Sequence, residues 1–326
     1  MKNILFATVV LFVTMPAHAL MGGDVDANLA SSPWAGVGAV SVNGATFSGA
    51  LIGSQYVLTA AHVVGGQEST PGNVHFTLNV KGNIKGDAGS NIGGAASHVV
   101  ATKIIVFPGF KGPTPGKDGV WHDDLALIKL ATPVSSDVPV YGLYDGGLNG
   151  KILTLVGYGS GEDAKSGVIS PASPNVKRAG QNRVDKVLMD DDGGTHDEIF
   201  IFDFDGLNAT SNIFGPPIPL NLTLGATIEA QFAGGDSGGP VFVNDNGVWK
   251  IAGIAAFNGN VTALPGSNIK FGGIGGGTVI AAYLPWIDST LASMAAPVPE
   301  PHAWLMLLIG LGLVRGVARR SRLQGS

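Results

Sequence analysis

The chain has 326 residues, of which 45% are hydrophobic and 13% are charged, and it contains 50 glycines and no cysteine. Its formal net charge of −5 at pH 7 disfavours binding to nucleic acid. The length is sufficient to bury a full core without disulfides, and abundant glycine with few charges favours an all-β protein of short strands and many turns.

A leader is predicted at the amino terminus. Lys2 precedes an apolar run over residues 4–15, and Ala17-His18-Ala19 follows it. Charged, apolar and small-residue regions in this order are typical of a secretory signal peptide. We therefore expect signal peptidase to remove residues 1–19, so that the exported chain begins at Leu20.

Two further segments carry groups suited to acid–base chemistry. Residues 57–63 read Val-Leu-Thr-Ala-Ala-His-Val, a strand-like run that ends near His62. Residues 122–130 begin His-Asp-Asp and continue as an apolar segment long enough to be a buried strand. A histidine base and a carboxylate that fixes its tautomer are two of the three groups needed for acyl transfer.

His122 stands beside Asp123 and Asp124, which raises the question of a metal site. One imidazole with two carboxylates and no spaced second histidine is not a metal signature, so we predict no metal and no cofactor there.

The segment from residue 160 to residue 229 contains the acidic turn Asp190-Asp191-Asp192-Gly193-Gly194 and the run Asp203-Phe204-Asp205. Clustered carboxylates suggest a calcium hypothesis, because hard cations prefer oxygen ligands. The spacing does not match a known calcium loop, and solvated turns are the favoured alternative.

The most informative stretch is Gly-Gly-Asp-Ser-Gly-Gly-Pro at residues 234–240, which precedes the apolar run 241–243. Glycines tolerate the backbone angles needed to hold the Ser237 hydroxyl outward and to direct backbone N–H groups at one point. This serine supplies the nucleophile that the histidine and aspartate segments lack.

Thr-Ala-Ala-His at residues 59–62, Asp-Leu-Ala-Leu at 124–127 and Gly-Asp-Ser-Gly-Gly-Pro at 235–240 together resemble the trypsin-like (chymotrypsin-fold) serine proteases. The resemblance runs from residue 20 to residue 291 and is weakest over 160–229. It implies an all-β fold of two six-stranded antiparallel Greek-key barrels followed by a C-terminal helix, with the catalytic groups in the cleft between the barrels.

The resemblance also implies roles for single residues. Asp124 directly precedes Leu-Ala-Leu as the family's aspartate does, whereas Asp123 is expected to be a solvated neighbour. Asp124 would orient His62, His62 would activate Ser237, and the N–H groups of Gly235 and Ser237 would bind the oxyanion.

Activation and specificity follow from the same resemblance. The free α-amino group of Leu20 is expected to pair with Asp236, so that signal peptidase itself activates the protein. The substrate pocket is expected to include Gln231, Asn258 and Gly275. Because Gln231 carries no negative charge, cleavage after Arg or Lys is disfavoured, and a small or uncharged side chain is expected.

The C-terminal segment has a second recognisable pattern. A Pro-Glu-Pro motif lies in the linker 292–302, and residues 303–326 form a hydrophobic segment with a basic tail. The apolar part, 303–314, falls short of the roughly 20 residues of a stable span. The pattern resembles the PEP-CTERM sorting signal of Gram-negative bacteria, which implies transient inner-membrane contact through a hydrophobic helix, processing by an exosortase, and delivery to the cell surface or extracellular matrix. A plain tail-anchored membrane protein is the alternative.

Together these patterns predict a secreted serine endopeptidase that acts on protein or peptide substrates. The alternative function is a surface or matrix binding protein that retains the protease fold without significant proteolysis, because a fold alone does not establish activity.

Overall fold

The computed structural model describes residues 20–26, 28–29, 31–78, 99–112, 114–116, 118–163, 167–206, 212–214, 223–225, 227–260 and 271–295. The predicted leader, the Pro-Glu-Pro motif and the tail therefore lie outside the described residues. The chain divides into two compact units, 1–288 and 289–326. Of the second unit, only the end of one helix is described.

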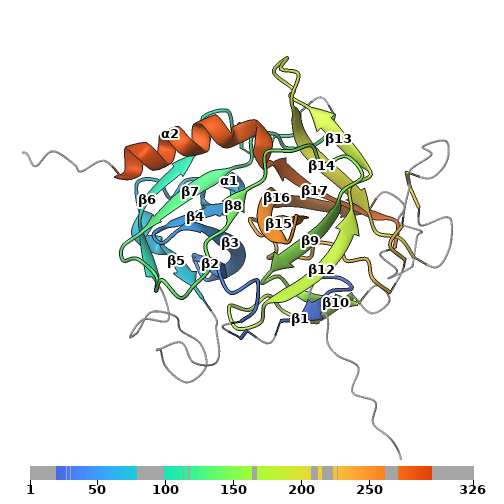
Figure 1. Cartoon of the computed structure of the whole chain (residues 1–326), viewed down its shortest axis with the longest axis horizontal. Helices are drawn as coiled ribbons and strands as arrows, with labels where there is room; N and C mark the ends of the chain where they lie inside the picture. Colours follow the sequence, from blue (N-terminus) through green and yellow to red (C-terminus); the bar gives the residue numbers. More distant parts are fainter. Residues whose placement is uncertain are drawn as a thin grey trace, which may run out of the picture. The chain divides into compact units, whose positions relative to one another are not determined.

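Six antiparallel strands form a closed barrel in the first half of the chain, in the order β2-β3-β4-β7-β6-β5 (Figure 1). The strands are β2 (Val37–Val42), β3 (Ala45–Gly53), β4 (Tyr56–Thr59), β5 (Val74–Thr77), β6 (Val99–Val106) and β7 (Ala126–Leu130). A single-turn helix, α1 (Ala61–Val64), and a short 3-10 turn, η1 (Pro71–Asn73), connect β4 to β5. The first predicted barrel is thus confirmed.

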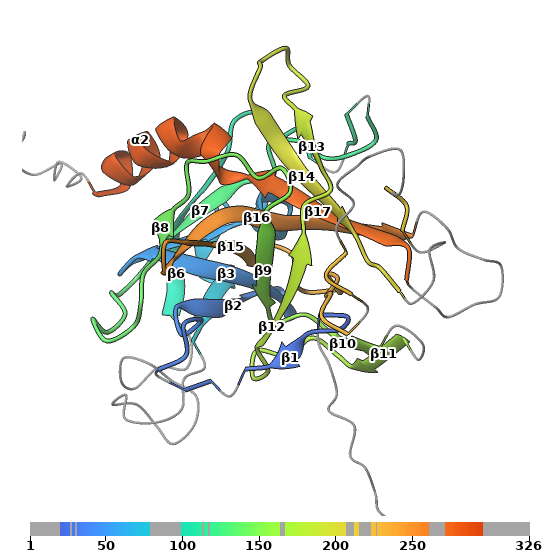
Figure 2. The ribbon, with the colours of Figure 1, turned by 45° about the vertical axis from the view of Figure 1, so that its right-hand side comes forward.

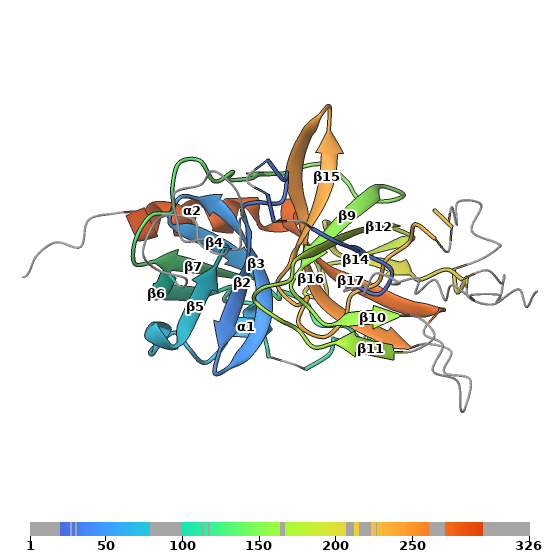
Figure 3. The same cartoon turned by 90° about the horizontal axis from the view of Figure 1, so that it is seen from below.

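Nine strands form the sheet of the second half, and its path runs β1-β12-β9-β15-β16-β17-β14-β13 with β8 parallel to β16. The strands are β1 (Asp24–Val25), β8 (Gly142–Leu143), β9 (Ile152–Gly157), β12 (Arg178–Arg183), β13 (Lys186–Met189), β14 (Asp197–Asp203), β15 (Pro240–Asp245), β16 (Val248–Asn260) and β17 (Gly273–Val279). A separate ribbon pairs β10 (Gly161–Asp163) with β11 (Gly167–Ser170), and Figure 3 shows the strands of the two halves as separate groups.

The second half differs from the six-stranded barrel of the prediction. Its path ends on the two-residue strand β1 and on β13, and β12, next to β1, is not paired with β13 although only Val184 and Asp185 separate the two strands in the chain. The ring is therefore interrupted at this point. The buried side chain of Asn182 spans the interruption by donating to the carbonyl oxygens of Asp203, at 2.8 Å, and Ala230, at 2.9 Å.

Two Asn-Gly pairs fix hairpins in both halves. Asn43 and Gly44 join β2 to β3 with φ of 50° and 83°, and Asn246 and Gly247 join β15 to β16 with φ of 52° and 89°. Two consecutive left-handed residues are what a type I′ turn requires, and this turn matches the twist of the strands it connects.

The cores of the two halves differ in composition. The first barrel is filled by aliphatic and aromatic side chains such as Leu51, Leu58 and Phe76. The second has an apolar cluster that includes Leu20, Leu155 and Phe200, but its buried residues also include several charged ones.

After β17 the chain passes through a 3-10 segment, η3 (Ile280–Tyr283), into helix α2 (Leu284–Ala295), where the closing helix was predicted. The ring of Trp286 lies 5.3 Å from that of Phe107. None of the helices in the described ranges combines the length and apolarity required to cross a membrane; residues 303–314 lie outside those ranges.

Candidate active site

The imidazole of His62 is held by Asp124 through two hydrogen bonds. Asp124 Oδ2 lies 2.6 Å from His62 Nδ1, and Oδ1 accepts the backbone N–H of His62 at 2.8 Å. Asp124 is fully buried, whereas the His62 side chain is 17% exposed. With Nδ1 donating to Asp124, Nε2 is left as the proton acceptor of the ring.

Small residues explain this placement of His62. β4 ends at Thr59, and Ala60 and Ala61 are completely buried where the chain turns into α1. A larger side chain at either position would displace the turn from its tightly packed surroundings. The ring of Trp121 packs edge-on against the imidazole at 5.4 Å.

Asp123 and Asp124 turn their carboxyl groups in different directions. Asp123 has a left-handed backbone with φ of 60°, and its Oδ1 accepts a hydrogen bond from the hydroxyl of Tyr283 at 3.0 Å. Burial raises the pKa of Asp123 to about 6, with the Glu198 charge adding to the effect. The prediction of a solvated Asp123 is therefore wrong: the residue is only 6% exposed, because its backbone directs the side chain inward.

The turn carrying Ser237 belongs to the second half but is fastened to the first barrel. Ser48 of β3 donates its backbone N–H to the Ser237 carbonyl at 3.0 Å and its hydroxyl to the Gly235 carbonyl at 3.0 Å. A Cβ atom on Gly238 would collide with Thr59 Oγ1 and with the Ser48 carbonyl. This close contact brings the serine turn against the end of β4, three residues before His62.

Gly235 and Ser237 each offer a backbone N–H group. Within the part of the chain that the structure describes, neither group donates to an acceptor. Gly235 is left-handed, with φ of 97°, which suits a glycine. Two free N–H groups flanking Asp236 are a suitable arrangement for binding an anionic oxygen.

Asp236 is 1% exposed and accepts hydrogen bonds from the N–H groups of Gly159 and Ala233, both at 2.9 Å. Burial raises the pKa of Asp236 to about 7, although these hydrogen bonds and the positive charge of Arg178 oppose the shift. Arg178 is itself buried, and no sequence pattern predicted its position. Its charge favours the ionised form of Asp236.

Leu20, the expected partner of Asp236, lies fully buried in the core of the second half. The next residue, Met21, forms a two-way backbone pair with Gln231, at 2.9 and 2.8 Å. The segment that begins at Leu20 is thus bonded to Gln231, which precedes the serine turn in the chain. The pairing of the Leu20 ammonium with Asp236 stays a prediction.

Gln231, Asn258 and Gly275 come together. Asn258 of β16 is the direct partner of Gly275 in β17, and a Cβ atom on Gly275 would collide with Gln231 Oε1. The Asn258 side chain donates to the Phe232 carbonyl at 2.6 Å. The Asn258 amide therefore connects β16 to the segment of Gln231 and Phe232, in the region expected to bind the substrate side chain.

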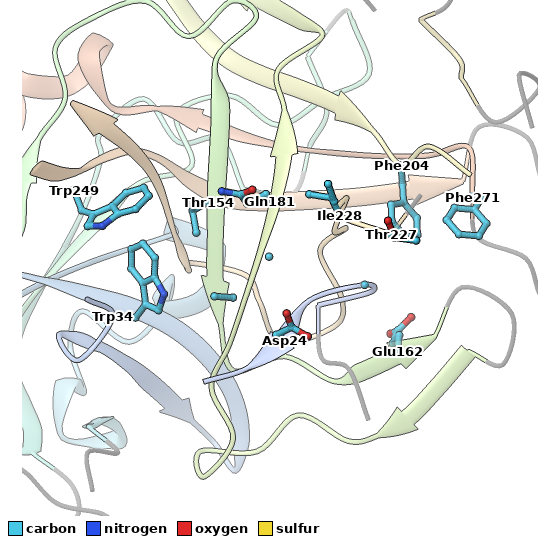
Figure 4. Close-up of a pocket in the computed structure, with 13 residues that line it drawn as sticks. Asp24, Trp34, Thr154, Glu162, Gln181, Phe204, Thr227, Ile228, Trp249 and Phe271 are labelled. Atoms are coloured by element: carbon cyan, nitrogen blue, oxygen red, sulfur yellow. The ribbon is translucent and has the colours of Figure 1, made fainter. Parts of the chain in front are cut away.

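A cavity of about 630 Å³ lies elsewhere, along β12 (Figure 4). Trp34 and Trp249 lie at one end of it, and Phe204 and Phe271 at the other. None of His62, Asp124 and Ser237 lines it. The sequence patterns did not predict this cavity, because its lining residues come from distant segments.

Only some of the residues considered for metal binding lie near one another. His122 is 8% exposed and bonds through Nδ1 to Glu198 Oε2 at 2.7 Å and through Nε2 to Asp118 Oδ2 at 3.0 Å. Asp190 and Asp191 approach this region, whereas Asp203 and Asp205 belong to none of the groups of three potential ligands within the described ranges. The calcium hypothesis stays a prediction.

Comparison with known proteins gives one match. The family model described as Trypsin matches residues 21–194, more than half of the chain. The matched range includes His62 and Asp124 but ends before Ser237. None of the curated proteins compared matches the chain.

Proposed function

The chain belongs to the trypsin family and is a serine-type peptidase, and from this we propose that it is an exported endopeptidase with Ser237, His62 and Asp124 as its catalytic triad. The observation that supports the triad most directly is the pair of hydrogen bonds between buried Asp124 and His62. The docking of the serine turn on Ser48 and Thr59 supports it further.

The proposed reaction uses each group in the state favoured by its surroundings. His62 Nε2 takes the hydroxyl proton of Ser237 while Ser237 Oγ attacks the peptide carbonyl carbon, and Asp124 stabilises the imidazolium. The N–H groups of Gly235 and Ser237 stabilise the oxyanion. His62 then protonates the leaving amine, and water hydrolyses the acyl-enzyme with the same base.

Labelling with a fluorophosphonate probe tests this proposal. The full chain should become labelled on Ser237, because the probe reacts with a serine that an adjacent base activates. Ser237→Ala should abolish labelling, and the matched variant Ser54→Ala, on an exposed turn of the first barrel, should keep it. Absence of labelling, or labelling at another serine, would favour the binding protein without proteolysis.

We propose a shallow substrate pocket that accepts a small or uncharged side chain before the cleaved bond. The support is the Asn258–Phe232 hydrogen bond, together with the neutral Gln231. Asn258→Gly removes the bridging amide and should extend cleavage to larger side chains in a peptide library. Strict cleavage after Arg in the unaltered protein would contradict the proposal.

For activation, we propose that removal of residues 1–19 creates an ammonium group at Leu20 that pairs with Asp236. A buried ammonium would favour the ionised carboxylate against the effect of burial. Amino-terminal sequencing of the exported protein should begin at Leu20, and any other start would refute this route.

For destination, we propose delivery to the cell surface or extracellular matrix of a Gram-negative bacterium, with an exosortase removing the tail. The support is the sequence pattern over residues 297–326. Mass spectrometry of the surface form should find the basic tail missing, and an intact tail would favour a tail-anchored membrane protein.

A further inference from the structure

Potential metal ligands converge at one place outside the triad. Three groups of His, Asp and Glu side chains have ligand atoms within 4.8 Å of one another in the described ranges, and all three groups lie in this cluster. It forms where the turn of the β13–β14 hairpin, visible in Figure 2, meets the segment that precedes Asp124. The groups are His122, Asp191 and Glu198; Asp190, His196 and Glu198; and Asp123, Asp191 and Asp192.

Two of the three groups are unsuited to a metal ion, because one is held by hydrogen bonds of His122 and the other is paired with a lysine. His122 donates or accepts through both ring nitrogens, and its 2.7 Å contact with Glu198 leaves no space for an ion between them. In the third group, the Lys111 ammonium lies 2.9 Å from Asp192 and 3.9 Å from Asp191. A fixed positive charge there opposes binding of a second one.

The remaining group has the spacing of metal ligands. His196 Nε2 lies 3.5 Å from Asp190 Oδ2 and 3.6 Å from Glu198 Oε1. Tetrahedral zinc with bonds of about 2.0–2.1 Å needs ligand atoms separated by about 3.4 Å. His196 directly precedes β14, and Glu198 is the second residue of that strand.

Neighbouring groups hold these ligands in place. The Glu198 carboxylate is bound on one oxygen by Tyr283, at 2.9 Å, and on the other by His122. Asp190 accepts the N–H of Gly194 at 3.1 Å and donates its own N–H to the His196 carbonyl at 3.1 Å. Such outer contacts orient metal ligands and raise their affinity.

Charge balance is an independent reason to expect a cation. The single O–H of Tyr283 faces both Asp123 and Glu198, at 3.0 and 2.9 Å, so it can donate to only one of these buried carboxyl groups at a time. Asp118, Asp190, Asp191 and Asp192 add further negative charge nearby, against one lysine and two histidines. A bound cation would offset the cost of burying like charges together.

We propose that Asp190, His196 Nε2 and Glu198 Oε1 bind a divalent transition-metal ion of the zinc class, with water completing the coordination. The imidazole ligand favours zinc over calcium, which prefers oxygen ligands alone. The half-exposed ring of His196 leaves the ion accessible from solvent. Through Glu198 and His122 the ion joins the hairpin to the segment that carries Trp121 and Asp124.

The sequence did not predict this site, because no single motif contains all of its ligands. His122 lacked a spaced second histidine, and the acidic turn suggested only calcium. His196, which one residue separates from the end of that turn, was the available signal.

Zinc binding can be measured independently of peptidase activity, with the full-length chain carrying Ser237→Ala to prevent self-digestion. After treatment with a chelator, titration calorimetry should show one zinc ion bound, and zinc should raise the unfolding temperature. His196→Ala should weaken binding by more than the roughly 10- to 100-fold that loss of an outer partner costs. Failure of the Ser237→Ala chain to bind zinc would overturn the proposal.

Two matched variants separate ligation from general attraction of a cation. Asp190→Asn and Asp192→Asn each remove one negative charge from the same turn, but only Asp190 is a proposed ligand. Asp190→Asn should weaken zinc binding strongly while Asp192→Asn changes it little, and equal losses would overturn the proposal. So would stabilisation by calcium alone that persists in His196→Ala. If His196→Ala fails to fold, the Asp190/Asp192 comparison still decides.

Discussion

The two halves of the molecule bury very different side chains. In the first barrel, residues 37–130, the buried members of the His, Asp, Glu, Lys and Arg types within the described ranges are His122, Asp123 and Asp124. All three come from the one segment that supplies Asp124 to the proposed catalytic triad. The corresponding residues of the second half are spread through it: Glu162, Lys177, Arg178, Glu198, Asp203, Asp205, Glu229 and Asp236.

This difference indicates that the halves hold their parts of the site by different forces. His62 and Asp124 rest on an apolar barrel, whose packing does not change with pH. The serine turn includes Asp236, whose pKa is raised to about 7 by burial. Protonation near neutral pH therefore acts mainly on the half that carries the nucleophile; in the first half it acts on Asp123, whose pKa is raised to about 6 by burial.

The strongest test asks whether the second half supplies an indispensable group. Ser237→Ala should lower kcat about 10⁶-fold, since loss of a triad serine removes the nucleophile while binding is retained. The measurement is hydrolysis of a chromogenic peptide, with Ser54→Ala as the control that should keep full activity. Retention of activity in Ser237→Ala would show that the reaction does not use this serine.

The contribution of the first half is tested by its aspartates. Asp124→Asn should lower kcat about 10⁴-fold, because the amide no longer stabilises the required tautomer of His62. Asp123→Asn is the matched control: its side chain contacts Tyr283 instead of His62, so its loss of kcat should be far smaller. Equal losses in both variants would contradict the assignment of Asp124.

Core truncation in the first barrel should cost stability equally at all pH values. Leu58 is fully buried in β4, and Leu58→Ala should lower the free energy of unfolding by about 2–5 kcal/mol. Denaturant unfolding at pH 5 and pH 8 measures this loss, and Val248→Ala, at a 58% exposed position, serves as control. A loss that differs between the two pH values would break the proposed contrast.

The second half should lose stability as the pH rises. In the full-length chain, which has no ammonium group at Leu20, burial raises the pKa values of Asp185, Asp205 and Asp236 to about 7. These carboxyl groups are more basic in the folded state than the usual value near 3.9. The stability that their protonated forms contribute is fully present below about pH 4 and is lost as the pH rises to about 7. The unfolding temperature should therefore be higher at pH 5 than at pH 8.

Asp205 is the sharpest probe of this trend. It is 3% exposed, and neither carboxylate oxygen has a hydrogen-bond partner within the described ranges, although nearby Thr223 lowers its pKa slightly. Asp205→Asn should raise the free energy of unfolding by about 1–3 kcal/mol at pH 8, because no charge is then buried, and change it little at pH 4. Exposed Asp137→Asn should have no such pH-dependent effect, and an unchanged pH profile in Asp205→Asn would refute the explanation.

Several features of the site were predictable from short segments. His62 follows two alanines that fit only a tight buried turn, and Asp124 directly precedes the apolar strand that positions it. Gln231, Asn258 and Gly275 lie together in the structure, and their role in specificity stays a prediction. The Asn-Gly pairs at 43–44 and 246–247 were available signals for hairpins, because their chemistry is local.

Other features depended on contacts between distant residues. The inward turn of Asp123 requires Tyr283, and the break between β12 and β13 is bridged by Asn182 and Asp203. The charged residues of 160–229 suggested a solvated surface, but Asp203 and Asp205 are buried. Charge alone does not reveal burial, because that depends on which segments fold over the residue.

Contiguous motifs were enough to predict the family, the first barrel and the candidates His62, Asp124 and Ser237. The folded chain was needed to see how the serine turn rests on the first barrel, which carboxyl groups are buried, and that His196 lies beside Asp190 and Glu198. These arrangements depend on distances between separate segments, and such distances are set by packing of the whole chain.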